Sequence, residues 1–460
     1  MSSFPAAVPA RREVGARSLL LRGSWSTVAL CFGTATAAVT ATIGPDARWL
    51  GALGRVIVER GSIPHGVPFA AAPSSGWPNV PVLAELVFRG LTGALGDRGL
   101  LLAQLVAVSV ALAGTRREMR RLGATDAGAA LVLALVVPGA LLAFAGIRAQ
   151  LFSLALFPLL VALLRREAAA PSRRIWLLPP LVALWSNLHG VVLLGLAAAG
   201  VYLVLERARL RPLESLCVAA SSLVALCATP ALAGTPRYYH DVLTSVAARR
   251  GYGLWASLSL HSGFDLLLVG VGALLLAAFL RSRPRPWEVV VVALLVLSTI
   301  HTARNGVWLL LFLAAPAATQ LRVRARPHPA VVHVLALLCL VAGALGIARG
   351  PQTAGAESVA VVRAIHDAHG RPILAEPATA EGIAAAGGRV WISNPLDAFA
   401  PAAQRAYLDW LDGRPSGDRL LAGIRTVVVT PGSPAARRLA PDGRFRVALR
   451  SARAIVFVRA

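Results

Sequence analysis

The chain has 460 residues, of which 56% are apolar and only 15% are charged. Soluble globular proteins carry roughly 25% charged residues, so this composition excludes an ordinary soluble enzyme and indicates a polytopic membrane protein. The 46 basic residues are all arginine and outnumber the 22 acidic residues, which gives a net charge of +24. Because the arginines fall in short clusters between apolar runs, they indicate membrane topology and not a nucleic-acid partner.

Eleven apolar runs are candidate membrane-spanning helices. The first follows an arginine-rich segment and is longer than the core of roughly 7 to 15 residues that is typical of signal peptides, so it predicts an uncleaved first helix. The runs lie at 25–43, 99–114, 126–147, 149–164, 175–189, 191–205, 213–233, 263–280, 287–301, 305–320 and 330–348.

The arginine clusters decide the orientation of these runs. All of them fall on one side of the membrane if each run crosses it once, and that side is the cytoplasm. The pattern predicts a basic cytoplasmic amino terminus over 1–24 and a multi-pass transmembrane domain over 25–349 in the inner (plasma) membrane. The clusters lie at 11–22, 116–121, 165–174, 207–211, 281–285 and 322–326.

Two regions lie outside the apolar runs on the opposite, outer side. The loop 44–98 contains charged amphipathic stretches that predict helices lying at the membrane surface, at 49–60 and 80–98. Residues 350–460 change in composition and predict a small extracytoplasmic α/β domain. Its expected strands are 424–430, 445–449 and 454–458, and its expected helices are 401–411 and 433–440. The fold class expected is therefore an all-α polytopic membrane domain followed by this α/β domain.

Polar side chains gather at the outer ends of the apolar runs. An ionisable side chain at membrane depth costs about 2.5 to 3.5 kcal/mol unless it faces a protein cavity. Three tight turns carry such groups, and the long loop adds two acids, so the sequence predicts one polar cavity at the outer leaflet. The turns hold Arg148; Asn187 and His189; and His301, Arg304 and Asn305, while the loop holds Asp46 and Glu85.

Each of these residues also has an ordinary structural interpretation. Asp46 could cap the helix that follows it, and Glu85 could pair with Arg89 four residues later. Arg148 and Arg304 could reach lipid phosphates, as arginines near helix ends commonly do. Trp77 and Trp185 are interpreted as anchors at the membrane interface.

The same residues resemble motifs of bacterial membrane proteins related to the GT-C glycosyltransferases. Those proteins show Asp-x-x-Trp-His, Gly-x-Ile-Pro and Trp followed by His-Glu in the first outer loop, then Arg-Pro-Gln and Trp-x-Asn-x-His-Gly. This chain has similar segments over most of its length. They are Asp46-Ala-Arg-Trp49, Gly61-Ser-Ile-Pro64, Trp77 to Glu85, Arg148-Ala-Gln150, Trp185-Ser-Asn187-Leu-His189-Gly190 and Arg304-Asn305. It departs from the pattern at Leu50 and at Val80-Pro81, which replace the histidines and an acid.

The resemblance implies sugar transfer from a polyprenyl-phosphate donor to an acceptor on the outer face of the membrane. It implies Asp46 as the base, with Glu85 in reserve, and Arg148 and Arg304 as the phosphate clamp. Asn187 and His189 would bind sugar hydroxyls, and His301 and Asn305 are further expected substrate-binding residues.

The partners expected are the lipid-linked donor and membrane lipid, without nucleic acid. No cofactor is predicted. Some GT-C enzymes use a divalent metal, but the sequence shows no carboxylate cluster that demands one. The four cysteines lie in apolar runs without metal-ligand spacing.

Two other functions stay open at this stage. The protein could be a transporter or flippase that uses the same arginine-lined cavity for a lipid-linked or anionic solute. Inverted repeats with broken helices would favour that function, and the sequence contains no detectable repeat. It could also be a catalytically inactive envelope scaffold, which the substitutions at Leu50 and Val80-Pro81 favour.

Overall fold

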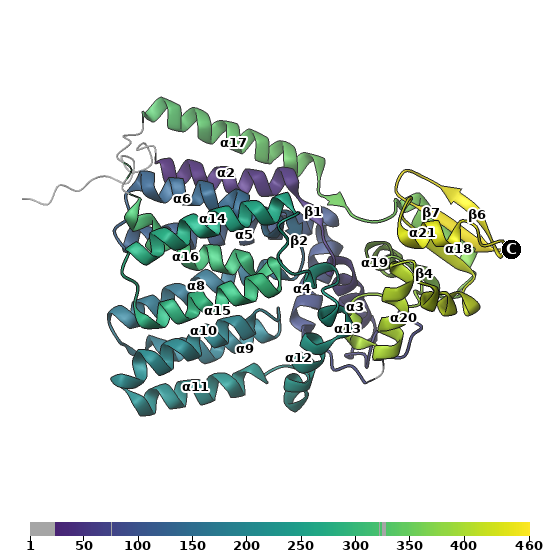
Figure 1. Ribbon diagram of the computed structural model, residues 1–460, viewed down its shortest axis with the longest axis horizontal. Helices are drawn as coiled ribbons and strands as arrows, with labels where there is room; N and C mark the ends of the chain where they lie inside the picture. Colours follow the sequence, from purple (N-terminus) through teal and green to yellow (C-terminus); the bar gives the residue numbers. More distant parts are fainter. Residues whose placement is uncertain (1–23, 75, 322, 324–327) are drawn as a thin grey trace, which may run out of the picture.

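A computed structural model describes residues 24–74, 76–321, 323 and 328–460. Stacked helices form one bundle, and the carboxy-terminal domain lies at one end of it (Figure 1). The predicted amino-terminal segment 1–24 lies outside the described residues except for Ser24, as does most of the arginine cluster 322–326.

The bundle helices correspond to the eleven apolar runs. α16 lies in the interior, with nearly every side chain buried, whereas α17 packs mainly against α2 at the edge. The helices are α2 (Trp25–Thr40), α5 (Asp97–Arg121), α6 (Asp126–Gly139) with α7 (Leu141–Ala145), α8 (Gln150–Ala169), η1 (Arg173–Leu177) with α9 (Leu178–Ser186), α10 (Val192–Leu205), α11 (Pro212–Leu226), α14 (Gly263–Arg281), α15 (Pro286–His301), α16 (Gly306–Gln320) and α17 (Pro329–Arg349).

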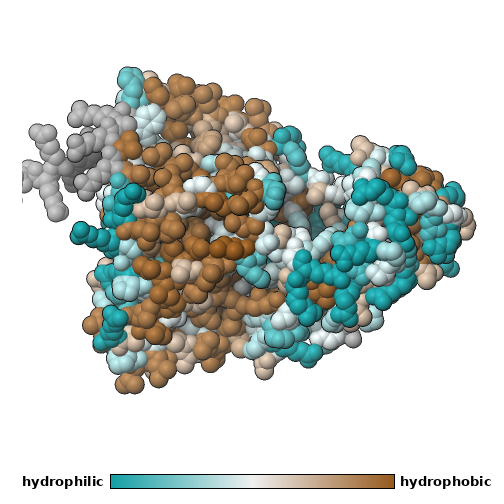
Figure 2. All heavy atoms as spheres, in the orientation of Figure 1, coloured by the Kyte–Doolittle hydropathy of each residue, from teal (hydrophilic) through white to brown (hydrophobic). Residues whose placement is uncertain are grey.

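The surface of the bundle identifies a membrane protein. An apolar band covers the helices and is bordered by hydrophilic surface at the far end and on the carboxy-terminal domain (Figure 2). Within the described residues, α5, α14 and α17 are each long and apolar enough to cross a membrane. The apolar helices α2, α6, α11 and α15 are shorter. That all eleven segments cross the membrane therefore stays a prediction.

Two amphipathic helices from the long loop lie between the bundle and the carboxy-terminal domain (Figure 1). They are α3 (Ala47–Arg60) and α4 (Val82–Leu95), close to the predicted surface helices. They pack tightly where Gly54 faces the backbone of Glu85, because a Cβ at Gly54 would lie 2.2 Å from the Glu85 carbonyl oxygen. Such a close approach requires glycine.

A three-stranded parallel sheet lies at the end of the bundle that faces the carboxy-terminal domain. Its strands are β1 (Thr42–Ile43), β2 (Gly146–Ile147) and β3 (Gln352–Thr353), in the order β2-β1-β3. The predicted runs 25–43 and 126–147 therefore stop being helical before their last residues. Two-residue strands have no detectable hydrophobic period, which is why the sequence did not predict this sheet.

The carboxy-terminal domain has a four-stranded sheet in the order β4-β5-β7-β6. The predicted strands and helices are present as β5 (Thr426–Val429), β6 (Phe445–Arg450), β7 (Ile455–Arg459), α20 (Pro401–Leu411) and α21 (Pro434–Leu439). The sequence analysis missed β4 (Ile373–Ala375), α18 (Ser358–Ala368) and α19 (Pro377–Ala385). The small α/β domain is thus confirmed.

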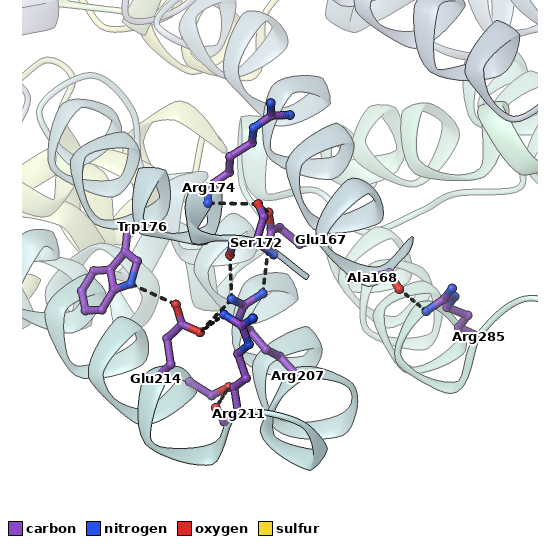
Figure 3. A network of polar contacts seen from close by, with 10 residues as sticks. Glu167, Ala168, Ser172, Arg174, Trp176, Arg207, Arg211, Glu214 and Arg285 are labelled. Atoms are coloured by element: carbon purple, nitrogen blue, oxygen red, sulfur yellow. Dashed lines mark hydrogen bonds and ion pairs between the residues drawn. The ribbon is translucent and has the colours of Figure 1, made fainter. Parts of the chain in front are cut away.

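Buried ion pairs connect the helices at the far end of the bundle, which is the end opposite the carboxy-terminal domain (Figure 3). Arg207, with a fully buried side chain, donates to Glu167 at 2.6 Å and to Glu214 at 3.0 Å. A second buried pair joins Arg165 to Glu288 at 2.9 Å. These contacts connect α8, α11 and α15. Arginines of the predicted clusters therefore also form structural ion pairs.

A candidate active site between the bundle and the carboxy-terminal domain

A cavity of about 710 Å³ lies where the bundle meets the carboxy-terminal domain. Its walls come from the start of α3, from the turns of the bundle that face the carboxy-terminal domain, from the segment containing α12 (Thr235–Thr244), and from the carboxy-terminal domain. The predicted site residues that line it are Asp46, Arg148, His189, His301, Arg304 and Asn305. Side chains separated by more than 250 residues in sequence thus share one space.

The small parallel sheet explains why Asp46 and Arg148 share the cavity. β1 and β2 run side by side, with Ile43 opposite Ile147. The Gly44 N–H then donates to the Ile147 carbonyl at 3.0 Å. Arg148 follows β2 directly, and Asp46 follows β1 after two residues, so both leave the same end of the sheet.

Asp46 does not cap the helix that it precedes. Its side chain makes no capping hydrogen bond, and its φ of 82° places the backbone in the left-handed region. This conformation is unfavourable for residues other than glycine and is concentrated at functional sites. Asp46 Oδ1 accepts a hydrogen bond from Trp49 Nε1 at 3.1 Å, which leaves Oδ2 available to a ligand.

Two arginines supply positive charge to the cavity. Arg148 is only 8% exposed, and its Nε has no hydrogen-bond partner in the described part of the protein. The Arg304 guanidinium lies 4.3 Å from the centre of the Trp255 ring, an arrangement that orients it by cation–π attraction. Among the described residues, no carboxylate lies within 4 Å of either guanidinium. Their charges are therefore available to an anion.

The remaining predicted residues around the cavity differ in how strongly they are held. His189 Nδ1 lies 2.8 Å from Ser153 Oγ, which in turn accepts from Trp185 Nε1 at 2.7 Å. This chain fixes the imidazole and leaves Nε2 for a ligand. Asn305 Nδ2 donates to Ser298 Oγ at 2.8 Å, and His301 is exposed.

Two predicted residues lie outside the cavity wall. The Asn187 amide donates to the carbonyls of Ala183 and Ala228, so it holds the turn together. Glu85 is fully buried and accepts from Asn79 Nδ2 at 2.8 Å, and it makes no ion pair with Arg89. Burial raises the pKa of Glu85 to about 8, so the carboxyl is mainly protonated at neutral pH.

The two tryptophans interpreted as interface anchors are instead interior residues. Trp185 is 1% exposed and Trp77 is 5% exposed. Each directs its indole N–H to a polar group of the protein, Ser153 and Asp397 respectively. The anchor interpretation is therefore wrong for both, because their N–H groups are satisfied inside the protein.

No protein-family model and no curated protein matches this chain. Solved structures do. ArnT from Cupriavidus metallidurans bound to undecaprenyl phosphate is 13% identical, covers 97% of this chain and 99% of its own length, and has a TM-score of 0.53. The apo state of ArnT is 14% identical, covers 95% of this chain and 97% of its own, and has a TM-score of 0.52. Mycobacterial arabinofuranosyltransferase AftD is 15% identical, covers 94% of this chain and 41% of its own, with a TM-score of 0.48.

The two ArnT structures decide the fold. It is the GT-C fold of polytopic membrane glycosyltransferases. At 13% and 14% identity, this likeness concerns the fold and leaves the reaction to be argued from the site.

Several cavity residues of this GT-C fold were missed by the sequence analysis. Glu376, Asn394 and Asp397 line the cavity from the carboxy-terminal domain. Asp397 accepts from Trp77 Nε1 at 3.0 Å, and burial raises its pKa to about 6. These residues lie in a loop, in a short 3-10 helix or at a helix start, and no pattern in a single sequence connects them to the turns of the bundle.

The positions where the chain departs from the family motifs also face this site. Leu50 and Pro81 line the cavity, where the related proteins have a histidine and an acid. The described residues contain no group of three His, Cys, Asp or Glu side chains suited to a metal ion.

Proposed function

We propose that the protein transfers a sugar from a polyprenyl-phosphate donor to an acceptor on the outer face of the membrane. The observation that carries this proposal is the cavity in which the Asp46 carboxylate shares space with two arginines that form no ion pair with the described residues. The undecaprenyl phosphate bound in the ArnT structure supports a lipid phosphate as the anion.

The two arginines are proposed to hold the phosphate of the donor. One planar guanidinium group can donate two parallel hydrogen bonds to the oxygens of a phosphate. This attraction strengthens as negative charge develops on the leaving phosphate. Arg148 sits at the end of β2 and Arg304 is stacked on Trp255, so both charges are fixed before the donor arrives. Fixed charges need no reorganisation during the reaction.

Asp46 is proposed to take the proton from the acceptor hydroxyl. The acceptor oxygen then bonds to the anomeric carbon of the sugar, and the bond from that carbon to the phosphate oxygen breaks. The electron pair of the broken bond stays on the polyprenyl phosphate, where the arginines stabilise it. His189, His301 and Asn305 are available for sugar hydroxyls, with Glu85 and Asn187 supporting the walls from outside the cavity.

The proposed reaction on the outer face of the membrane requires one particular orientation of the chain. We propose eleven crossings in the inner membrane, with 1–24 in the cytoplasm, 25–349 as the transmembrane domain with its long loop 44–98 outside, and 350–460 outside the cell membrane. The arginine clusters support it, because they would all face the cytoplasm. The cavity would then open to the outer leaflet.

The test is a transfer assay with the protein in lipid nanodiscs and radiolabelled undecaprenyl-phosphate sugars as donors. Asp46→Asn keeps the size of the side chain and removes the proton acceptor, so turnover is expected to fall by about 10² to 10⁴. The matched control is Asp412→Asn, which changes an exposed carboxylate of the carboxy-terminal domain outside the cavity.

Three results would contradict the proposal. Turnover of Asp46→Asn within twofold of the wild type would remove Asp46 as the base. Movement of labelled lipid across the bilayer without any transfer would favour the transporter. Binding of the lipid with neither transfer nor movement would favour the inactive scaffold, in which Leu50 and Pro81 have replaced reactive groups.

A further inference from the structure

We infer that Glu381, in the carboxy-terminal domain, is a positioning residue that holds the Asp46 backbone in place, so that the domain completes the active site. The inference rests on the proposed function, because it concerns the base of the proposed reaction. Asp46 and Glu381 are 335 residues apart in sequence. Neither composition nor motif relates them.

The geometry is a bidentate contact between the two residues. The Asp46 backbone N–H donates to both carboxylate oxygens of Glu381, at 3.1 Å each. Asn394 Nδ2 donates to Glu381 Oε1 at 2.7 Å, and Glu381 is 2% exposed. An acceptor that is itself anchored and buried has little freedom, so it fixes the position of the N–H that it binds.

The backbone at Asp46 needs such a constraint. A left-handed conformation is unfavourable outside glycine and persists only where the surroundings impose it. Glu381 holds the backbone N–H of Asp46, and Trp49 holds Oδ1 of its side chain. Together these two contacts direct the second carboxylate oxygen of Asp46 toward the cavity.

Docking of α19 on α3 keeps Glu381 in reach. Near the other end of α3, Arg55 donates to the carbonyls of Ala385 and Ala384, at 3.0 and 3.2 Å, in the last turn of α19. Arg55 therefore contributes to docking without touching Asp46. It supplies a control that separates docking of the domain from positioning of the base.

The charges around the pair make the contact visible to pH. Glu381 faces Asp46, Arg48 and Asn394, and Asp46 also interacts with Arg148, Arg304 and Asp397. Burial and the negative charge of Asp46 raise the pKa of Glu381 to about 8. The carboxyl that accepts from the Asp46 N–H therefore changes its charge near pH 8.

The experiment follows Trp49 by ¹⁹F NMR in the full-length protein in nanodiscs, labelled with 5-fluorotryptophan. Trp49→Phe assigns the resonance, which reports on the bond from Trp49 to Asp46 and does not depend on turnover. Glu381→Gln keeps an acceptor oxygen and removes the titrating carboxyl. The wild-type Trp49 resonance is expected to change with pH around the Glu381 pKa of about 8, and this change is expected to be absent in Glu381→Gln.

Glu381→Ala removes the acceptor as well. It is expected to give a shifted or doubled Trp49 resonance and a turnover at least about tenfold lower, because the left-handed turn is no longer held. Arg55→Ala should keep the wild-type titration of the Trp49 resonance. If Glu381→Ala fails to fold, Glu381→Gln still decides the question through the presence or absence of that titration.

The outcomes distinguish the inference from the proposed function. An unchanged titration of the Trp49 resonance in Glu381→Gln would overturn the positioning role, even if Asp46→Asn abolishes transfer. Loss of this titration in Arg55→Ala would also overturn it, since docking alone would then explain the effect. A loss confined to the Glu381 variants supports the positioning role, even if no donor is turned over.

Discussion

At the scale of single residues, the two cavity arginines differ in how they are held. Arg304 is stacked on Trp255, whereas the Nε of Arg148 is buried and has no hydrogen-bond partner among the described residues. Replacing Arg304 by lysine keeps the charge. It removes the planar group that stacks on Trp255 and that can donate two hydrogen bonds to one phosphate. We expect Arg304→Lys to weaken binding of undecaprenyl phosphate about tenfold, which is about 1.4 kcal/mol, and Arg304→Ala to weaken it further.

Equilibrium binding of radiolabelled undecaprenyl phosphate to detergent-solubilised protein measures this effect. Arg237→Ala is the control, because that arginine is 76% exposed and lies outside the cavity. Wild-type affinity in Arg304→Ala would show that the arginine does not contact the lipid phosphate.

Glu85 gives a prediction about pH and stability. Its pKa in the folded protein is raised to about 8 by burial, from an ordinary value of 4.5. The folded state therefore holds the proton more tightly than the unfolded state, and stability falls as pH rises through this window, by about 1.4 kcal/mol per pH unit. Glu85→Gln removes this titration. Its Tm should change less between pH 5 and pH 8 than the Tm of the wild type.

Thermal unfolding in detergent at several pH values provides the comparison. Parallel pH dependence of Tm in the wild type and Glu85→Gln would mean that Glu85 is ionised in the folded protein.

The predictability of the site also differs from residue to residue. Asp46, Arg148, His189 and Arg304 could be singled out because charged or polar groups at apolar helix ends need a cavity. Glu381 and Asp397 could not, because they belong to a separate domain whose docking no local pattern encodes. Glu85 was recognisable as unusual, but its depth beneath α3 depends on how α3 and α4 pack.

At the scale of helices, the packing of α4 against α3 supports the helix that begins directly after Asp46. A methyl group at Gly54 would meet the Glu85 carbonyl oxygen at 2.2 Å, whereas one at Gly90 on α4 meets nothing within 4 Å. We expect Gly54→Ala to destabilise the protein by about 1 to 3 kcal/mol. Gly90→Ala should be neutral or stabilising by about 0.5 to 1 kcal/mol, since glycine is a poor helix former.

Tm values of the two variants, measured side by side, test this packing. Equal Tm values would mean that α3 and α4 separate without cost.

The ion pairs of Arg207 at the far end of the bundle connect α8 with α11 (Figure 3). Arg207→Met leaves the buried carboxylate of Glu167 without its cation, and we expect a loss of about 3 to 5 kcal/mol. Arg209→Met, in the same short 3-10 helix, changes an exposed arginine and should cost less than about 0.5 kcal/mol. Similar Tm values for the two variants would contradict a structural role for Arg207.

At the scale of the whole molecule, composition and arginine distribution were sufficient to predict a helical membrane domain followed by an α/β domain. The bundle and the later strands could be predicted because they have long apolar runs or clear β character. The sheet that aligns Asp46 with Arg148 could not, because its strands have two residues each and form only between segments more than 100 residues apart.

The proposed orientation has a direct test. After the four native cysteines are replaced, Arg419→Cys in the carboxy-terminal domain should react with a membrane-impermeant maleimide on intact cells. Arg173→Cys, exposed at the far end of the bundle, should react only after lysis. The reverse pattern would invert the topology and place the cavity at the cytoplasmic leaflet.

The central claim is that the cavity binds a polyprenyl phosphate with its phosphate next to Asp46. The measurement that tests it most directly is a cryo-electron microscopy structure of the protein in nanodiscs with saturating undecaprenyl phosphate. The account predicts phosphate density within hydrogen-bonding distance of both Arg148 and Arg304, with the Asp46 carboxylate facing the same space. Lipid density only outside the cavity, or an empty cavity under these conditions, would contradict it.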